Sequence, residues 1–156
     1  MGRLPAFLCL VVALAVVAAG CGSGSSGTLN GAAIKRAVYV WLTAAANRPQ
    51  SSFSHGTEVV LYPMCVSGAD STYVRAEATP FTDGKIGQDI AFYLQRGPDG
   101  YRVRGVDFLI GPRGRPRDVP LAVWRDLQRP ACGLSVKAIR ELLKLRTEHK
   151  VPDFTF

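Results

Sequence analysis

The sequence predicts an α+β domain in which an N-terminal helix packs on a curved antiparallel sheet of about four strands, followed by two C-terminal helices. Three observations support this prediction. Apolar residues recur at helical spacing in residues 30–47, strand-type runs fill residues 58–110, and helical patterns return in residues 118–148. The length of 156 residues suits a single domain of this kind.

The first helix is predicted by an apolar stripe along one face. Its members, at spacings of three and four, are Ile34, Val38, Trp41, Leu42 and Ala45. Asn30 or Thr28 can cap the start. Pro49 ends the helix, because its ring disfavours helical backbone at the preceding residue.

Two strands are expected after this helix. Residues 58–64 are rich in Val, Leu and Tyr, and Pro63 indicates an edge or a strand end because it lacks an amide proton. Residues 71–79 alternate between polar and apolar side chains. This alternation predicts a half-buried strand.

Residues 89–95 and 101–110 are predicted to form a hairpin. The turn is Gly97-Pro98-Asp99-Gly100, where Pro and Asp suit a type I turn and Gly100 can adopt a positive φ. Arg102 and Val106 share one parity along the second strand, which would force them to the same face. A β-bulge at Gly105 resolves this conflict, because one extra residue moves the side chains that follow it to the opposite face of the sheet.

The residues Phe92-Tyr93-Leu94 and Gly100-Tyr101-Arg102-Val103 give the hairpin a likeness to known domains. It resembles small envelope domains of the cystatin-like or nuclear-transport-factor-like type. The resemblance implies a curved sheet wrapped around a long helix over residues 30–110. Such folds host enzymes and non-enzymes alike, so the resemblance implies no activity.

The C-terminal part begins with an irregular loop, residues 111–117. Asp118 is the expected cap of a short helix ending at Leu127, and Ser135 the expected cap of a last helix. The apolar stripe of that last helix is Val136, Ile139, Leu142 and Leu143.

Residues 1–20 have the pattern of an export signal. Arg3 supplies positive charge, residues 6–19 form an apolar stretch, and small residues follow. The stretch is too short to cross a bilayer comfortably and lacks a charged stop-transfer flank. Its removal as a signal peptide is therefore predicted.

Ala18-Ala19-Gly20-Cys21 closes this leader and resembles the lipobox of bacterial prolipoproteins, with Ala18 in place of the more usual Leu. The resemblance implies cleavage before Cys21, a lipid on its sulfur, and allows an acyl chain such as palmitate on the new amino terminus. Two or three acyl chains anchor a domain firmly, whereas one holds it only marginally. The alternative is an ordinary cleaved signal followed by an incidental Cys.

Residues 21–29 consist of Cys21 and a Gly/Ser-rich run, which is expected to be a flexible tether. The globular domain is predicted to occupy residues 30–156. A lipid-anchored protein of this design is expected on the extracytoplasmic face of the cell membrane, in the cell envelope.

The cysteines indicate a disulfide bond. Cys9 leaves with the signal and Cys21 would carry lipid, so Cys65 and Cys132 remain in the domain. In an exported protein such a pair is most simply a disulfide. Two free buried thiols are the alternative, and no metal site is expected because neither Cys has zinc-ligand neighbours.

The net charge of +7 predicts anionic partners. For an exported protein these are anionic lipid or cell-wall polymer, and nucleic acid is not expected. The sharpest basic feature is Arg113, Arg115 and Arg117, whose guanidinium groups could engage phosphate or carboxylate. The alternative is a solvated basic loop.

Catalytic patterns are not found in the sequence. His55 and His149 lie in no metal-ligand spacing, and the serines around His55 lack a nucleophile elbow. Carboxylates are scattered along the chain: Glu58, Glu77, Asp83 and Asp89. Aromatic residues could line a ligand cavity but are more often core: Tyr39, Trp41, Tyr73, Phe92, Phe108 and Trp124.

These observations favour a non-catalytic lipoprotein whose domain binds a small apolar ligand or an anionic surface, with no cofactor. One alternative is a secreted small hydrolase-type enzyme with a site assembled from dispersed residues. The other is an accessory subunit of a larger envelope complex, which an exposed apolar patch would indicate.

Overall fold

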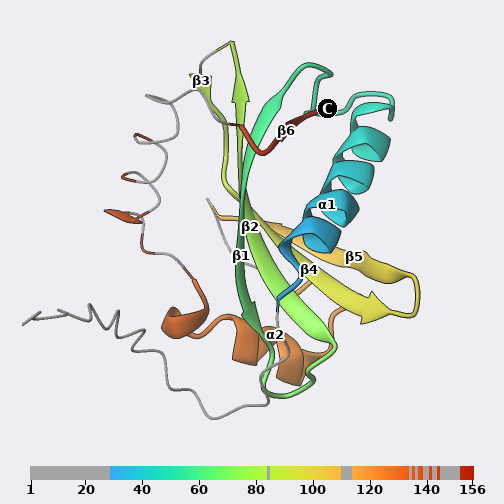
Figure 1. Cartoon of the computed structure of the whole chain (residues 1–156), viewed down its shortest axis with the longest axis vertical. Helices are drawn as coiled ribbons and strands as arrows, with labels where there is room; N and C mark the ends of the chain where they lie inside the picture. Colours follow the sequence, from blue (N-terminus) through green and yellow to red (C-terminus); the bar gives the residue numbers. More distant parts are fainter. Residues whose placement is uncertain are drawn as a thin grey trace, which may run out of the picture.

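The computed structural model describes residues 29–83, 85–109, 114–133, 135, 137–138, 141, 144 and 152–156. One antiparallel sheet forms its centre, with a long helix, α1 (Gly31–Ala46), along one face (Figure 1). A short helix, α2 (Leu121–Leu127), lies at the opposite face near one end of the sheet. The domain therefore has a three-layer arrangement over part of the sheet and two layers elsewhere.

The sheet has the strand order β5-β4-β2-β1-β6, and β3 pairs with β2 beside this path. Its strands are β1 (Glu58–Val66), β2 (Tyr73–Thr82), β3 (Lys85–Ile86), β4 (Ile90–Gly97), β5 (Gly100–Phe108) and β6 (Phe154–Thr155). A short 3-10 helix, η1 (Pro130–Cys132), follows α2. All strand pairs are antiparallel.

Helix α1 forms where its apolar stripe predicts it. The Asn30 side chain accepts a hydrogen bond from the Ala33 amide at 3.1 Å, which confirms Asn30 as the N-cap. The stripe residues that are buried against the sheet are Ile34, Val38, Leu42 and Ala45. Trp41, at the edge of this stripe, is only partly buried and meets Phe92 of β4 edge-to-face at 5.4 Å.

The β4–β5 hairpin and its bulge are confirmed. Gly100 has a φ of +112°, as the turn requires. Tyr93 pairs with Gly105 but Leu94 pairs with Val103, so Arg104 is the extra residue of the bulge. Gly105 is needed next to it because a Cβ there would lie 2.2 Å from the Cβ of Pro116.

Strand β2 is buried on both faces, and the predicted half-buried strand is wrong. Val74, Ala76 and Ala78 face α1, as expected for the apolar parity. The polar parity is also buried, with Arg75 and Glu77 each 3% exposed. The reason is that α2 and η1 cover this second face near one end, so its polar side chains bond to protein instead of water.

The predicted architecture is wrong in the size of the sheet and in its C-terminal helices. The described sheet has six strands rather than about four. The additions are β3 and β6, which have two residues each and are too short to show alternation in sequence. Strand β6 is set by tertiary pairing with β1, where Phe154 lies opposite Val59.

Of the two predicted C-terminal helices, α2 is shorter than expected. Its N-cap residue is Pro120, and no side chain caps the start of the helix. Asp118 is therefore not the cap. The predicted last helix lies mostly outside the described residues, although the Ser135 hydroxyl accepts a hydrogen bond from the Ala138 amide at 3.1 Å. No helix among the residues that the structure describes is long and apolar enough to span a membrane.

The disulfide between Cys65 and Cys132 is present. It joins β1 to η1, with the two Cα atoms 5.5 Å apart and 67 positions separating them in sequence. Cys132 is buried among Tyr73, Tyr93 and Leu127. The bond therefore ties the α2 end of the chain to the sheet.

Candidate functional site

The main candidate site is a groove between α1 and β5, with a volume of about 790 Å³. Its apolar floor is formed by Ala37, Val40, Trp41, Tyr101 and Val103. Val40 is 58% exposed on α1 and adds its apolar surface to that of Trp41 and Tyr101. The groove is therefore an apolar surface that the fold itself does not cover.

Two aromatic side chains give the groove a fixed shape. Trp41 is held in the floor by edge-to-face contacts with Phe53 at 6.0 Å and Phe92 at 5.4 Å. Tyr101, at the start of β5, packs partly against the apolar core. The floor is thus preformed by rings that already have packing partners.

Positive charge borders this apolar floor. Arg36 of α1 and Arg102 of β5 both line the groove and are exposed, and Asp99 in the hairpin turn is the one carboxylate of the lining. Among the described residues, neither arginine forms an ion pair. Exposed guanidinium groups with free donors are suited to bidentate binding of carboxylate or phosphate.

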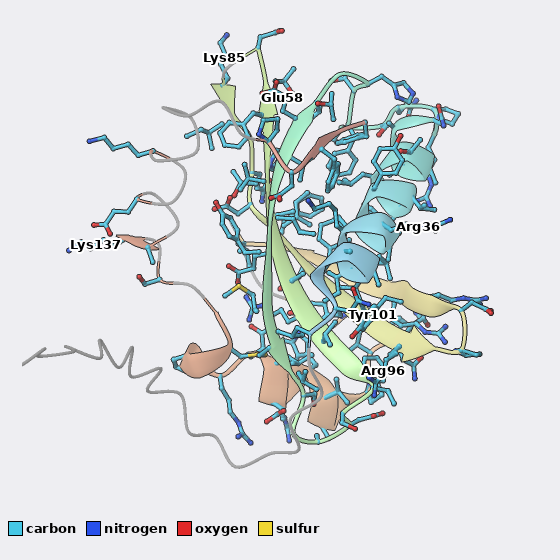
Figure 2. The ribbon with its side chains drawn as sticks, in the orientation of Figure 1. Arg36, Glu58, Lys85, Arg96, Tyr101 and Lys137 are labelled. Atoms are coloured by element: carbon cyan, nitrogen blue, oxygen red, sulfur yellow. A yellow bond between two sulfur atoms is a disulfide. The ribbon has the colours of Figure 1, made fainter. Side chains whose placement is uncertain are left out.

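Arg96 and Arg104 are also exposed, and they line an adjacent hollow along the hairpin. Figure 2 shows Arg36, Tyr101 and Arg96 on the same side of the molecule, on α1 and on the hairpin beside it. The Arg104 Nε donates a hydrogen bond to the Gln95 side chain at 2.9 Å. The hairpin therefore presents its arginines on a short, well-paired β-ribbon.

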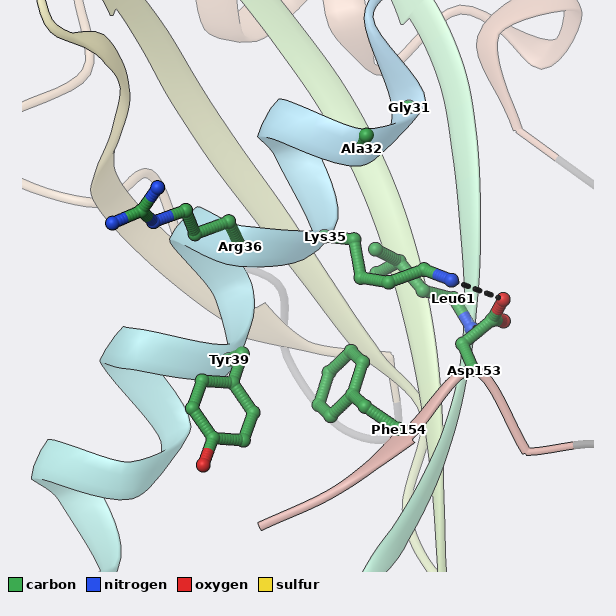
Figure 3. Close-up of a pocket in the computed structure, with 8 residues that line it drawn as sticks. All are labelled: Gly31, Ala32, Lys35, Arg36, Tyr39, Leu61, Asp153 and Phe154. Atoms are coloured by element: carbon green, nitrogen blue, oxygen red, sulfur yellow. Dashed lines mark hydrogen bonds and ion pairs between the residues drawn. The ribbon is translucent and has the colours of Figure 1, made fainter.

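A second hollow, of about 550 Å³, lies on the other side of α1 against β1 and β6 (Figure 3). An ion pair of 3.2 Å between Lys35 and Asp153 crosses it, and Asp153 also accepts a hydrogen bond from the Leu61 amide at 2.7 Å. Tyr39 meets Phe154 edge-to-face at 5.6 Å. Lys35 and Asp153 thus pair with each other and fasten the segment that leads into β6, whereas Arg36, which lines both hollows, forms no ion pair among the described residues.

The face of the sheet toward α2 holds a buried polar pair. The Arg75 Nη2 donates to the Glu77 carboxylate at 2.5 Å, and each of these side chains is 4% exposed. The Arg75 Nη1 donates to the Leu127 carbonyl at 2.7 Å, which connects the pair to the end of α2. A Cβ on Gly133 would lie 3.5 Å from the Glu77 Oε1, so the backbone after η1 packs closely over the pair.

Nearby, Asp126 of α2 binds the loop between β1 and β2. Its carboxylate accepts hydrogen bonds from the Gly68 amide at 2.5 Å and the Ser67 hydroxyl at 3.0 Å, and pairs with Arg129 at 2.9 Å. Burial raises the pKa of Asp126, but these three partners and the Ala69 amide together lower it more, so its net pKa lies below the ordinary value. The carboxylate therefore acts as a charged structural link.

The arginine loop is only partly described. Arg113 lies outside the described residues, Arg117 is exposed, and Arg115 donates to the Val119 carbonyl at 2.7 Å. One guanidinium of the predicted anion site therefore already donates a hydrogen bond within the segment that precedes α2. The loop remains a prediction as a binding surface.

The lipid-attachment and cleavage residues, Ala18, Ala19, Gly20 and Cys21, lie outside the described residues, as does His149. His55 is described, and its Nε2 lies 2.9 Å from the Asn47 Oδ1. The neighbouring Ser51 hydroxyl accepts a hydrogen bond from the Phe53 amide at 3.0 Å. Around His55 the described contacts are therefore loop-forming contacts.

Sequence reasoning missed both the groove and the buried pair. Arg36 and Arg102 are far apart in the chain, and only the packing of α1 beside β5 brings them to one rim. A signal was present in α1, where Val40 lies outside the predicted apolar stripe. Arg75 and Glu77 gave no signal, because polar residues at strand spacing normally indicate a solvent-facing side.

Metal-ligand clusters of three or more His, Cys, Asp or Glu side chains are not found within the described ranges. No protein-family model, curated protein or solved structure significantly matches this chain.

Proposed function

We propose that this chain is a lipid-anchored protein of the cell envelope whose domain binds an amphipathic anion in the groove between α1 and β5. The ligand class has an apolar body, such as an alkyl chain or a ring, and one carboxylate or phosphate. The anchor is the lipid on Cys21, and the domain is a binding module rather than an enzyme.

The observation that carries the binding proposal is the pairing of an apolar floor with unpaired arginines. Burial of apolar ligand surface on Trp41, Tyr101 and Val103 contributes about 25 cal/mol per Å². Arg36 and Arg102 then select ligands with a negative group at one end. Neither feature alone defines this ligand class, but together they fit an amphipathic anion.

Two separate observations, one in the leader and one in the domain, support the proposal of a lipid anchor outside the cytoplasm. The lipobox-like residues stand directly before the Gly/Ser-rich run that leads into α1. The Cys65–Cys132 disulfide is the kind of bond that persists in an oxidising compartment outside the cytoplasm.

The binding proposal is tested by titrating the protein with dodecanoate and with dodecanol as the uncharged control. Trp124→Phe leaves Trp41 as the single tryptophan, so the fluorescence of Trp41 reports on the groove. We expect saturable binding of dodecanoate, weaker binding of dodecanol, and a loss of about tenfold for dodecanoate in Arg36→Gln. Arg48→Gln, an exposed arginine beyond the end of α1, is the matched control and keeps the affinity.

Equal binding of the acid and the alcohol, or no saturable change at all, would overturn this ligand class. Ala44→Phe places a ring at the exposed edge of the groove and is expected to block both ligands. The anchor is tested separately by the intact mass of protein extracted from membranes: a mass without acyl chains on Cys21 overturns it.

A further inference from the structure

We infer that the β4–β5 hairpin and the start of α1 form a basic surface that rests on the anionic lipid of the membrane holding the anchor. The hairpin surface consists of Arg36, Arg96, Arg102 and Arg104. This inference rests on the proposed lipid attachment at Cys21, and it adds the orientation in which the domain meets the bilayer.

The hairpin surface has the charge that an anionic bilayer requires. Its four arginines are exposed, and within the described part of the chain none of them pairs with a carboxylate. Asp99, in the turn, is the one acidic side chain between residues 95 and 104. Arg96, Arg102 and Arg104 all line one hollow of about 330 Å³ along the hairpin, with Arg96 opposite Tyr101 and Arg102 opposite Gln95 in the strand pairing, so that the cations lie on both faces of the hairpin.

The point where the anchor enters the domain lies beside this surface. Leu29 and Asn30 line the same hollow as Arg96 and Tyr101, which joins the first described residues to the hairpin. Cys21 precedes Leu29 by eight positions. A coil of that length and composition has an end-to-end distance of about 16 Å.

This short connection makes a weak surface contact effective. A flexible linker of this length holds its two ends at millimolar effective concentration, so an affinity too weak for free protein suffices for anchored protein. Each basic residue near an anionic surface strengthens binding by about fivefold. Because the field decays over about 8 Å at physiological ionic strength, only the side of the domain nearest the anchor contributes.

Two cations at the opposite end of the molecule serve as a control for the hairpin surface. Lys85, in β3, lies at the far end of the sheet from Arg96 (Figure 2). Arg48 follows the end of α1 that is remote from its Leu29 side. If the hairpin surface faces the bilayer, these two cations face away from it.

The test uses the chain from residue 21 with Cys21→Ser, which contains every described element but no lipid anchor. Its sedimentation is measured with vesicles of phosphatidylcholine alone and with an equimolar mixture of phosphatidylcholine and phosphatidylglycerol. We expect binding to the anionic vesicles alone, weakening as salt is added. Arg96→Gln with Arg104→Gln is expected to lose about 25-fold in binding constant, and neither residue lines the α1–β5 groove.

Arg48→Gln with Lys85→Gln removes the same charge at the far end and is expected to bind like the parent chain. Equal losses in the two double variants would show a response to net charge alone and overturn the inference. Binding to isolated wall polymer but not to anionic vesicles would also overturn it. Unacylated Cys21 in cells, with vesicle binding intact, would overturn the proposed anchor while leaving the hairpin surface in place.

Discussion

Both faces of strand β2 are buried, but the contacts that bury them differ. The face toward α1 is apolar, with Val74, Ala76 and Phe92 each at most 1% exposed. The face toward α2 buries Arg75 and Glu77 of the same strand beside an apolar cluster that includes Tyr93, Val123 and Leu127. Strand β2 thus contributes only apolar side chains to the core on one side, and a buried ion pair beside an apolar cluster on the other.

This difference shows two ways of specifying a packed layer. Apolar side chains need only fill volume, so a smaller residue costs free energy in proportion to the cavity it leaves. Buried charges need particular partners, so removing one partner costs far more than removing both. The α1 face should therefore respond to mutation gradually and the α2 face in an all-or-none way for each pair.

The largest expected effect is on the α2 face. Arg75→Met removes the positive charge beside Glu77 and the donor to the Leu127 carbonyl, and we expect unfolding free energy to fall by about 4 kcal/mol. Arg75→Met with Glu77→Leu should recover more than half of that loss, as measured by urea denaturation. Two losses that simply add would contradict an interdependent pair.

The second largest effect is expected from removing the disulfide, which should destabilise the α2 side more than the α1 side. Closing a loop over 67 positions contributes about 4 kcal/mol in the chain-entropy estimate, and removing a native disulfide typically costs about 2–5 kcal/mol. We expect Cys65→Ser with Cys132→Ser to lower the unfolding free energy by about 3 kcal/mol and to speed hydrogen exchange in α2 more than in α1. Equal exchange in both helices would contradict a local role at the α2 end.

The α1 face is expected to respond less than Arg75→Met does, and in proportion to the volume removed. Leu42→Ala leaves a cavity beneath α1, where Leu42 is 1% exposed, and should cost about 3 kcal/mol. Leu42→Met, which nearly conserves volume, should cost less than about 1.5 kcal/mol in the same thermal or urea measurement. A cost for Leu42→Met as large as that for Leu42→Ala would show that this face also depends on one particular shape.

The features that were predictable from sequence depend on nearby residues. Helix α1 has its apolar stripe and its Asn30 cap within a few turns, and the hairpin has its turn residues between two β-prone runs. The Gly105 conflict also located the bulge, because parity along one strand is a local property. The disulfide followed from counting the cysteines that remain after Cys9 and Cys21 are assigned.

The features that were not predictable depend on distant residues. Strand β6 exists because Phe154 meets Val59 in space, and two residues carry no periodic signal of their own. Arg75 and Glu77 have the sequence pattern of a solvent face until α2 covers them. The groove is likewise missed, since its rim joins Arg36 on α1 to Arg102 on β5.

The smallest expected effect concerns Asp126 and is a pH dependence on the α2 face. The Gly68 amide, the Ser67 hydroxyl and Arg129 hold the folded-state pKa of Asp126 below its unfolded value, against the effect of burial. A lowered carboxylate pKa contributes stability that is fully present above the unfolded pKa, near 4, and is lost as the pH falls through the folded pKa. Asp126→Asn should therefore cost about 1.5 kcal/mol at pH 7 and progressively less below pH 4. Asp118→Asn, at an exposed carboxylate near the same helix, is the matched control and should change the unfolding free energy by less than about 0.5 kcal/mol. A cost for Asp126→Asn that is the same at acid and neutral pH would mean that the hydrogen-bond geometry, and not the charge, links α2 to the β1–β2 loop.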